Sequence, residues 1–501
     1  MVRDHRASAA SSSVAPGAST AGPPSSLEAP GKPTRVRYIV LAFAAALSMI
    51  TYLDRVCISS AQTSIIEDLG LTSEADLKWV FWAFALAYSL FEMPTGWLGD
   101  VYGPKRVLIR IVLWWSAFTA ITGAIGMRVD GYVIGSLGVL VVVRFLFGMG
   151  EAGAYPNITR ALHNWFPFHE RGLAQGVVWM SARLMGGLTP AVWMVLVEGV
   201  SVLGTPPLLH WRATFWAFGA LGLVWCLLFA WWFKDRPEAK PSVNAAELAL
   251  IRTAAAETEA GHRHLPWGRL LSNSNLWILG LMYFCQAYGW YFYITYLPRF
   301  LETQYGVAAD SVAGSLYKGG PLWMGAIGCV LGGYLTDWYI RRTGNRRLGR
   351  KVFGVFGHAM CVVCFLLCPF APTAFWFFLA ISLAGFFADM TMGSSWAVCQ
   401  DVGRRHAAVV AGFMNMVGNF GGSVAILATG FVLDASLARH SVRLGIDVAQ
   451  MTEAQRIAGL LSGYHINFVI YALVFVVGTV CWTLIDATKP VVPDEPVRAA
   501  A

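Results

Sequence analysis

Long apolar runs and short polar connections alternate along almost the whole chain. A helix needs about 20 mostly apolar residues to cross the hydrocarbon core of a bilayer. The pattern therefore predicts an all-α membrane protein with twelve transmembrane helices. The predicted spans cover residues 38–60, 79–98, 107–126, 135–156, 172–196, 212–233, 276–298, 315–336, 352–370, 374–397, 408–433 and 466–485.

The composition favours a membrane protein over a soluble one. Hydrophobic residues make up 56% of the chain and charged residues only 13%, whereas soluble domains carry about 25% charged residues. The net charge of +8 is therefore read as a topology signal rather than as a sign of nucleic-acid binding. All nine cysteines lie in apolar runs, where they are expected to act as packing residues and not as disulfide partners.

Lysine and arginine gather in one set of connecting loops. When the N-terminus is placed in the cytoplasm, most of the basic loop residues fall on the cytoplasmic side. This asymmetry is the one that orients membrane proteins, so both termini are predicted to be cytoplasmic.

The one long cytoplasmic connection lies near the middle of the chain and divides it into two halves of six spans. Asn244 and Glu247 are typical of a capping box and predict a short helix that reaches about Glu259. The connection has no catalytic motif, and His262 and His264 have no further metal ligands near them in the sequence. The predicted organisation is a disordered cytoplasmic tail (1–37), an N-terminal half (38–233), a linker (234–275), a C-terminal half (276–485) and a second cytoplasmic tail (486–501).

The two halves repeat a short motif. Gly96–Asp100 (GWLGD) follows the second span, and Gly333–Asp337 (GYLTD) follows the eighth. Two homologous halves are typical of transporters that bind substrate at the interface between the halves and rock around it.

The motif at Gly96–Arg106 continues as GWLGDVYGPKR. Lys105 and Arg106 lie just past the cytoplasmic end of the second span, where the helix dipole favours cations. Asp100 is placed to meet the positive N-terminal end of a helix from the other half. A surface salt bridge without a gating role is the alternative.

The first and fourth predicted spans each hold two charged residues that are candidates for function. Asp54 and Arg55 are adjacent in the first span, where charges need partners or water. Arg144 and Glu151 are seven residues apart in the fourth span, so they share one helix face. The guanidinium fork of Arg144 matches a carboxylate, and Glu151 can take the proton that proton coupling requires. The alternative is a buried ion pair that only fixes helix packing.

Together these motifs resemble a known family. The loop Gly96–Arg106 is similar to the signature G-x-L-x-D-x-x-G-x-[KR]-[KR] of the major facilitator superfamily. Tyr52–Arg55 (YLDR), with Arg144 and Glu151, resembles the anion:cation symporter family within it, whose members include bacterial hexuronate, galactonate and glucarate transporters. The resemblance covers about residues 36–490.

The resemblance implies a substrate site, a proton-coupling pair and a gate. In the family, the contact made by the residue matching Asp100 helps to hold the outward-facing state. Expected substrate contacts are Tyr52, Arg55, Tyr88, Arg144, Trp396 and Asn415; expected proton-coupling residues are Asp54 and Glu151; expected gating residues are Asp100, Lys105, Arg106 and Asp337.

Two positions depart from the family pattern. Arg183 stands where sugar-acid transporters have a glutamine that binds substrate, and Glu92 stands where a glutamine is common. Either these two residues neutralise each other, or Arg183 adds a second anion-binding arm. The second alternative predicts a dicarboxylate, or a substrate more acidic than a simple aldonate.

Five further polar residues lie inside predicted spans. Asp389 and His358 are expected to relay protons or, more commonly for such residues, to satisfy a local partner. Gln286, Tyr288 and Tyr293 are expected to line the cavity or to face lipid near the interface.

The sequence therefore predicts a proton-coupled symporter that imports a small organic anion, such as a sugar acid, by alternating access. An uncoupled facilitator or an exporter of organic or aromatic acids is the alternative. No enzyme motif, metal site or cofactor is expected; the coupling ion is expected to be H⁺. The expected partners are the anion and the lipid bilayer, without nucleic acid, and the protein is expected to work as a monomer in a bacterial inner membrane.

Overall fold

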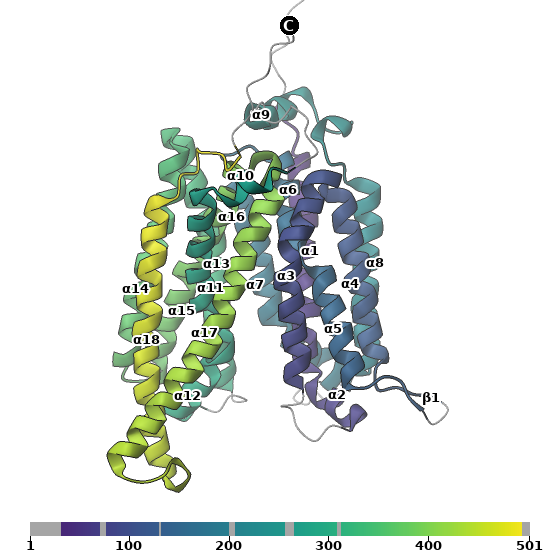
Figure 1. Ribbon diagram of the computed structural model, residues 1–501. Coiled ribbons are helices and arrows are strands. Elements are labelled where there is room, and N and C mark those ends of the chain that lie inside the picture. The colour runs from purple at the N-terminus through teal and green to yellow at the C-terminus, as the bar shows by residue number, and fades with distance from the viewer. Residues whose placement is uncertain are drawn as a thin grey trace, which may run out of the picture.

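The computed structural model describes residues 32–70, 77–129, 132–199, 206–255, 265–307 and 312–492, and nearly all of this chain is helical. The helices form two bundles that stand side by side (Figure 1). The N-terminal bundle contains α1 (Val36–Ser60), α2 (Gln62–Leu69), α3 (Lys78–Tyr102), α4 (Pro104–Ala124), α5 (Leu137–Glu151), α6 (Ala154–Trp165), α7 (Arg171–Trp193) with the π-helical η2 (Met194–Glu198), and α8 (Trp211–Trp232).

The C-terminal bundle is built in the same way. It contains α11 (Ser274–Thr295), α12 (Leu297–Tyr305), α13 (Val312–Thr343), α14 (Arg346–Leu367), η5 (Cys368–Phe370), α15 (Ala374–Met390), α16 (Met392–Gly403), η6 (Arg404–His406), α17 (Ala407–Leu444), η7 (Val448–Gln450) and α18 (Glu453–Leu484). Between the bundles lie η4 (Pro237–Ala239), α9 (Ala245–Ala255) and α10 (Trp267–Leu271) of the linker. A minimal hairpin, β1 (Arg128–Val129) paired antiparallel with β2 (Tyr132–Val133), connects α4 to α5.

The predicted twelve-helix architecture is confirmed. When α5 is joined with α6 and α15 with α16, the described residues form twelve long helical segments. The α5–α6 segment breaks at Gly153, whose φ of 85° lies in the left-handed region that glycine adopts without strain. By length and composition, eight helical stretches of the described chain could cross a membrane, and one of them, Ala374–Leu444, holds two of the twelve segments.

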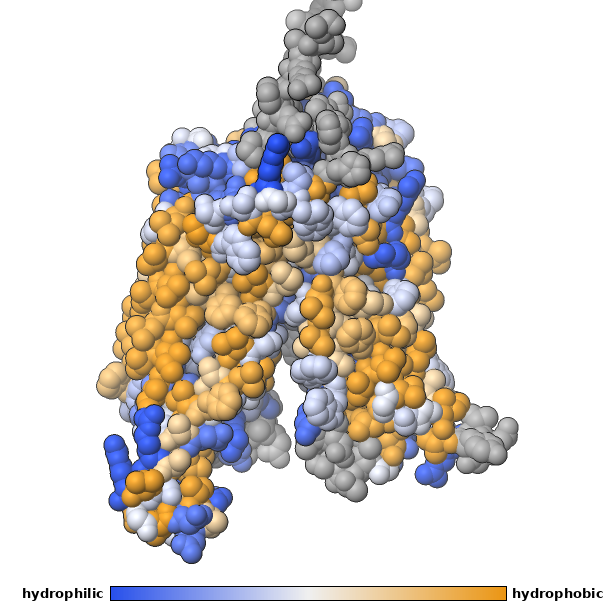
Figure 2. Space-filling view, in the orientation of Figure 1, coloured by the Kyte–Doolittle hydropathy of each residue, from blue (hydrophilic) through white to orange (hydrophobic). Residues whose placement is uncertain are grey.

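The outer surface suits lipid rather than water. On the face that Figure 2 shows, a broad hydrophobic band crosses the middle of both bundles, and hydrophilic residues gather towards the two ends, most of all at the linker end. Large apolar side chains such as Leu227, Trp231 and Phe431 are exposed on this surface. Contiguous apolar surface of this extent is unfavourable in water, so the band marks the part of the molecule that faces the bilayer.

The two halves meet at the linker end and separate at the opposite end (Figure 1; Figure 2). α3 packs against α17, and α7 packs against α13. The approach is close because glycines line it: a Cβ placed on Gly176 would lie 2.3 Å from the carbonyl oxygen of Cys329, and one on Gly412 would lie 2.7 Å from that of Glu92. The cleft between the halves therefore opens away from the linker.

The buried apolar clusters follow the same division. The cluster that contains Trp179 and Trp396 joins residues of both halves. A second cluster, around Phe292, belongs to the C-terminal half alone, and a third, around Phe215, belongs to the N-terminal half alone. The halves thus share a core at the linker end and have separate cores towards the open end.

The linker is tied to the start of the first helix, which corrects two predictions. The disordered tail was predicted to reach residue 37, but α1 begins at Val36 and the Thr34 backbone N–H donates to Asn244. Asn244 accepts from the Glu247 backbone N–H as predicted. The Glu247 carboxylate does not complete the capping box; it accepts from the backbone N–H groups of Val36 and Arg37 at the start of α1. Residues 1–31 lie outside the described residues.

Two other predictions fall partly outside the described chain. The end of the linker helix near Glu259, with His262 and His264, lies outside it. Within the predicted C-terminal tail, Val491 donates its backbone N–H to Val402 at 2.8 Å, so the tail packs on the C-terminal half as far as the structure describes it. Residues 493–501 lie outside the described residues.

Candidate functional site

Arg55 and Glu151 form an ion pair inside the N-terminal half. Arg55 Nη2 lies 2.9 Å from Glu151 Oε1; the Arg55 side chain is 24% exposed, whereas that of Glu151 is 1% exposed. The Arg55 guanidinium lies 4.5 Å from the ring centroid of Tyr88 and 5.4 Å from that of Tyr52. Three helices, α1, α3 and α5, therefore converge on one arginine that solvent can still reach.

Arg144 is held differently from Arg55. Its side chain is buried, and its guanidinium lies 4.3 Å from the Phe147 ring centroid and 5.2 Å from that of Phe84. The Nε atom has no hydrogen-bond partner among the described residues. Because aromatic rings offset little of the cost of burying a full charge, this guanidinium is well suited to gain an anion.

Asp54 lies inside the N-terminal half, where the charged groups that interact with it are Glu151 and Arg144. It is buried, and neither carboxylate oxygen has a hydrogen-bond partner in the described part of the chain. An ionised carboxylate without donors is costly in such a place, whereas the protonated acid costs far less. Asp54 therefore has the surroundings expected of a group that gains and loses a proton.

The predicted mutual neutralisation of Glu92 and Arg183 is wrong. Arg183 on α7 makes a two-pronged ion pair with Asp389 on α15, with Nε–Oδ2 at 2.6 Å and Nη2–Oδ1 at 3.0 Å. The remaining amino group, Nη1, donates to the Tyr52 hydroxyl at 3.0 Å. The pair joins the two halves, and both of its side chains are almost fully buried.

Glu92 instead binds amides across the interface between the halves. The Asn415 side-chain amide donates to Glu92 Oε1, and that of Asn419 donates to Oε2 at 3.2 Å. Glu92 lies on α3 and both asparagines lie on α17. Asn415, a predicted substrate contact, is therefore already engaged with a carboxylate of the protein.

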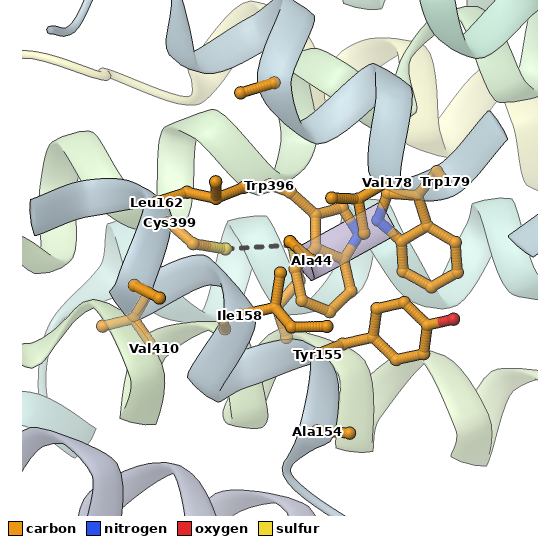
Figure 3. Packing of buried hydrophobic residues seen from close by; sticks show 14 of the residues in the cluster. Ala44, Ala154, Tyr155, Ile158, Leu162, Val178, Trp179, Trp396, Cys399 and Val410 are labelled. Carbon is orange, nitrogen blue, oxygen red and sulfur yellow. Dashed lines mark hydrogen bonds between the residues drawn. The ribbon is translucent and has the colours of Figure 1, made fainter. Parts of the chain in front are cut away.

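Trp396 lies in the shared core and not on the cleft wall. Figure 3 shows it beside Trp179 and Tyr155, and the ring centroids lie 5.1 Å and 6.0 Å away. Its indole Nε1 donates to the Tyr283 hydroxyl at 3.2 Å. In this conformation the predicted substrate contact of Trp396 is closed off, because the side chain is fully buried between the halves.

Two of the other intramembrane polar residues, Gln286 and His358, have local partners. The Gln286 side-chain amide donates to the Ala388 carbonyl at 3.1 Å, and His358 Nδ1 accepts from Trp482 at 3.2 Å. Gln286, Tyr288 and Tyr293 are all buried in the C-terminal half, so they neither line the open cleft nor face lipid.

The linker end is held shut by a contact that the sequence predicted. Asp100 at the end of α3 accepts from the backbone N–H groups of Ala408 at 3.1 Å and Val409 at 2.9 Å, in the first turn of α17. Arg160 Nε lies 3.8 Å from Asp100 and its Nη1 donates to the Arg404 carbonyl at 2.9 Å. An acid at a helix N-terminus is stabilised by the helix dipole.

Asp337 makes the corresponding contact in the opposite direction. It accepts from Gly172 at 3.2 Å and Leu173 at 2.7 Å, in the first turn of α7. Arg350 lies 3.0 Å from Asp337 and 3.1 Å from Asp401.

Asp401 also binds Arg171 of the N-terminal half at 3.0 Å. Sequence reasoning missed Arg171, Arg350 and Asp401. Their position beside span ends was the available signal, but sequence spacing cannot pair residues 230 positions apart.

Lys105 and Arg106 are not part of this half-to-half contact in the described structure. The Lys105 backbone N–H donates to Asp235 at 2.8 Å, which caps α4 within the N-terminal half. The Arg106 side chain is exposed.

Comparisons with known proteins agree with this architecture. The profile of the Major Facilitator Superfamily matches residues 44–426. The chain is 34% identical to the probable sulfoacetate transporter of Cupriavidus necator, over 80% of this chain and 88% of that protein. It is 29% identical to the probable galactarate/D-glucarate transporter of Escherichia coli, over 80% of this chain and 88% of that protein.

Solved structures show the same fold at low sequence identity. The proton:xylose symporter aligns with a TM-score of 0.64 at 15% identity, covering 90% of this chain and 96% of that structure. The fucose:proton symporter of E. coli aligns with a TM-score of 0.61 at 14% identity, covering 90% of this chain and all of that structure.

Proposed function

Because this chain belongs to the Major Facilitator Superfamily of transporters and is not an enzyme, we propose that it imports a small organic anion together with a proton, by alternating access. The observation that carries the proposal is the pair of Arg55 and Glu151, in which a partly exposed cation is held by a buried carboxylate. The relatives are named as a probable sulfoacetate transporter, a probable galactarate/D-glucarate transporter and a hexuronate transporter, and these names support an organic anion as the substrate class.

Two arginines supply the attraction for that anion. Arg55 is partly exposed, and Arg144, close enough to interact with it electrostatically, is buried with an unpartnered Nε. Tyr52 and Tyr88 lie against Arg55 and orient it. A carboxylate that binds Arg55 gains a charge-assisted contact, which is about twice as strong as a neutral hydrogen bond.

Anion binding and proton binding are linked through Glu151. When a substrate carboxylate takes over Arg55, Glu151 loses its counterion while it stays buried, and protonation then becomes the less costly state. Asp54, without hydrogen-bond donors, accepts a proton for the same reason. Linkage is reciprocal, so a bound proton raises the affinity of the site for the anion.

The conformation fits one end point of the cycle. The halves touch at the linker end, and if the linker is cytoplasmic, as the loop charges predict, the cleft faces the outside. In this proposal Asp100 and Asp337 stabilise the closed cytoplasmic side, and Lys105 and Arg106 act only from the first turn of α4. The proposed setting is a bacterial inner membrane, with both termini cytoplasmic and the protein working as a monomer.

Uptake into proteoliposomes tests the proposal. Radiolabelled galactarate, L-galactonate and sulfoacetate are supplied with and without an inward proton gradient. Accumulation of one anion above equilibrium only when the gradient is present is the expected result. Arg144→Ala should abolish it, whereas Arg252→Ala, at an exposed linker arginine paired with Glu238, should not.

Gradient-independent equilibration would instead identify an uncoupled facilitator and reduce Asp54 and Glu151 to structural charges. Efflux of preloaded anion without inward uptake would identify an exporter. Absence of movement of all three anions in either direction would contradict transport of this substrate class.

A further inference from the structure

Arg183 holds its carboxylate in the geometry in which an arginine binds a free anion. Both prongs of its guanidinium reach the two oxygens of Asp389, which is the fork arrangement that recognises carboxylates. The guanidinium lies 4.7 Å from the ring centroid of Trp290 and 5.5 Å from that of Trp179. This is a complete anion site whose present occupant is a side chain of the protein.

The occupant comes from the other half of the molecule. Arg183 belongs to α7 and Asp389 to α15, and the space around the carboxylate is kept by Gly325 of α13, where a Cβ would lie 2.3 Å from Asp389 Oδ2. A buried ion pair across an interface that must open is unfavourable. It contributes little net stability while it is intact, and it strongly destabilises the structure when one partner is lost. If a bound anion replaces Asp389 at Arg183, the guanidinium keeps a counterion when the two halves separate.

Tyr52 places this site next to the proposed substrate site. The same tyrosine accepts a hydrogen bond from Arg183 at its hydroxyl and lies against the Arg55 guanidinium at its ring. The two arginines are therefore separated by one tyrosine side chain. A short molecule with an anionic group at each end can contact both.

We propose that Arg183 is a second anion-binding subsite and that Asp389 is its resident carboxylate, which the second anionic group of a dianionic substrate displaces. The inference rests on the proposed transport of an organic anion and names its substrate class: small molecules with two anionic groups. Two of the relatives are named as probable transporters of sulfoacetate and of galactarate or D-glucarate, which are molecules of this class.

The displaced carboxylate takes up a proton. Once a substrate group binds Arg183, Asp389 stays buried without a counterion, and a proton from the open cleft forms an O–H bond on one of its oxygens. Arg183 is the charged group that faces Asp389 in the described structure. The other titratable side chains that interact with the pair are tyrosines and cysteines: Tyr52 from α1, Tyr283 and Tyr293 from α11, Cys329 from α13 and Cys361 from α14.

The site then keeps the same net charge before and after binding. A dianion is consequently expected to bind with one proton more than a monoanion of the same skeleton.

Binding to the purified full-length protein tests the inference with matched probes. Galactarate is compared with L-galactonate, and sulfoacetate with acetate, at several pH values. In the wild-type protein the dianion of the pair that binds should be favoured, and its affinity should rise as the pH falls. Asp389→Asn leaves the fork without a resident carboxylate, so dianion affinity should rise by about tenfold and lose part of its pH dependence, with the monoanion little changed.

Arg183→Gln should lower the affinity for the dianion to that for the monoanion. Because a single substitution leaves one buried charge unpaired, the neutral double variant Arg183→Gln/Asp389→Asn is the folding control and should bind like Arg183→Gln. An unchanged ratio of dianion to monoanion affinity in Arg183→Gln, or equal weakening of both probes in Asp389→Asn, overturns the inference and leaves anion transport intact. If the wild-type protein binds neither pair, the proposed function itself fails, and this inference fails with it.

Discussion

Asp100 and Asp337 make the same contact in opposite directions across the interface between the halves. Each carboxylate accepts two backbone N–H groups from the first turn of a helix that belongs to the other half, α17 for Asp100 and α7 for Asp337. The linker end is thus closed by a pair of related latches. Opening that end requires both helix N-termini to leave their acids.

Asparagine at either latch should loosen the linker end. Hydrogen bonds to a charged group contribute about 1.5–3 kcal/mol, so Asp100→Asn and Asp337→Asn should each speed amide hydrogen exchange in the first turns of α17 and α7. A rough change of 1–2 kcal/mol corresponds to about a 5- to 30-fold faster exchange by opening.

The matched control is Asp235→Asn. Asp235 also accepts a helix N-terminal N–H, from Lys105, but within one half. The Asp235→Asn variant should leave amide exchange in α7 and α17 unchanged. Equal effects in all three variants would show that the contacts of Asp100 and Asp337 are not specific to the half-to-half interface.

Glu151→Gln should separate anion movement from the proton gradient. The amide cannot gain and lose a proton, so uphill accumulation should fall to the equilibrium level, while exchange of external for internal anion continues. Uptake with a gradient and counterflow without one measure the two quantities. Glu170→Gln is the control. The Glu170 carboxylate lies 2.8 Å from Arg37 Nε, and this ion pair is not part of the cleft. Uphill uptake that survives in Glu151→Gln would exclude coupling through this residue.

Gly176→Ala should disturb the contact between α7 and α13. The added methyl group would lie 2.3 Å from the Cys329 carbonyl oxygen, a backbone atom that cannot turn aside. Overpacking of this kind costs about 1–3 kcal/mol, so the melting temperature should fall. Gly268→Ala on α10, where nothing lies within 4 Å, should leave it unchanged or slightly raised. Similar melting temperatures for both variants would contradict the tight interface.

Acidification should weaken the linker-end contact through His169. Burial lowers the pKa of His169; Glu170 and Asp337 oppose this shift and Arg341 and Arg37 add to it, and the net change is downward. The closed state therefore favours the neutral ring. Above about pH 6.5, the ordinary histidine pKa, the ring is neutral in either state and the closed contact keeps its full stability.

As the pH falls below that value, an open state with His169 in water binds the proton more readily than the closed state does. The free energy of the closed state relative to the open state therefore rises. After correction for the intrinsic pH dependence of amide exchange, protection in the first turn of α7 should fall on acidification in the wild-type protein and less in His169→Gln. The same fall in both proteins would assign the pH effect to another group.

The sequence by itself determined the architecture. Apolar runs of membrane length fixed the helices, because a backbone in lipid must satisfy its own hydrogen bonds and forms helices to do so. The repeat of Asp100 and Asp337 gave the two halves, and the dipole at a helix N-terminus predicted the kind of group that Asp100 meets. These conclusions depend on local chemistry, which sequence spacing carries.

Only the tertiary structure decided which charges pair. The sequence left open whether Glu92 and Arg183 neutralise each other; in the structure Glu92 binds Asn415 and Arg183 binds Asp389. Helical periodicity places a residue on a face of its own helix but does not say which helix of the other half comes to lie against that face. Those partners are more than 200 positions away, and the packing of glycine-lined helices across the interface selects them.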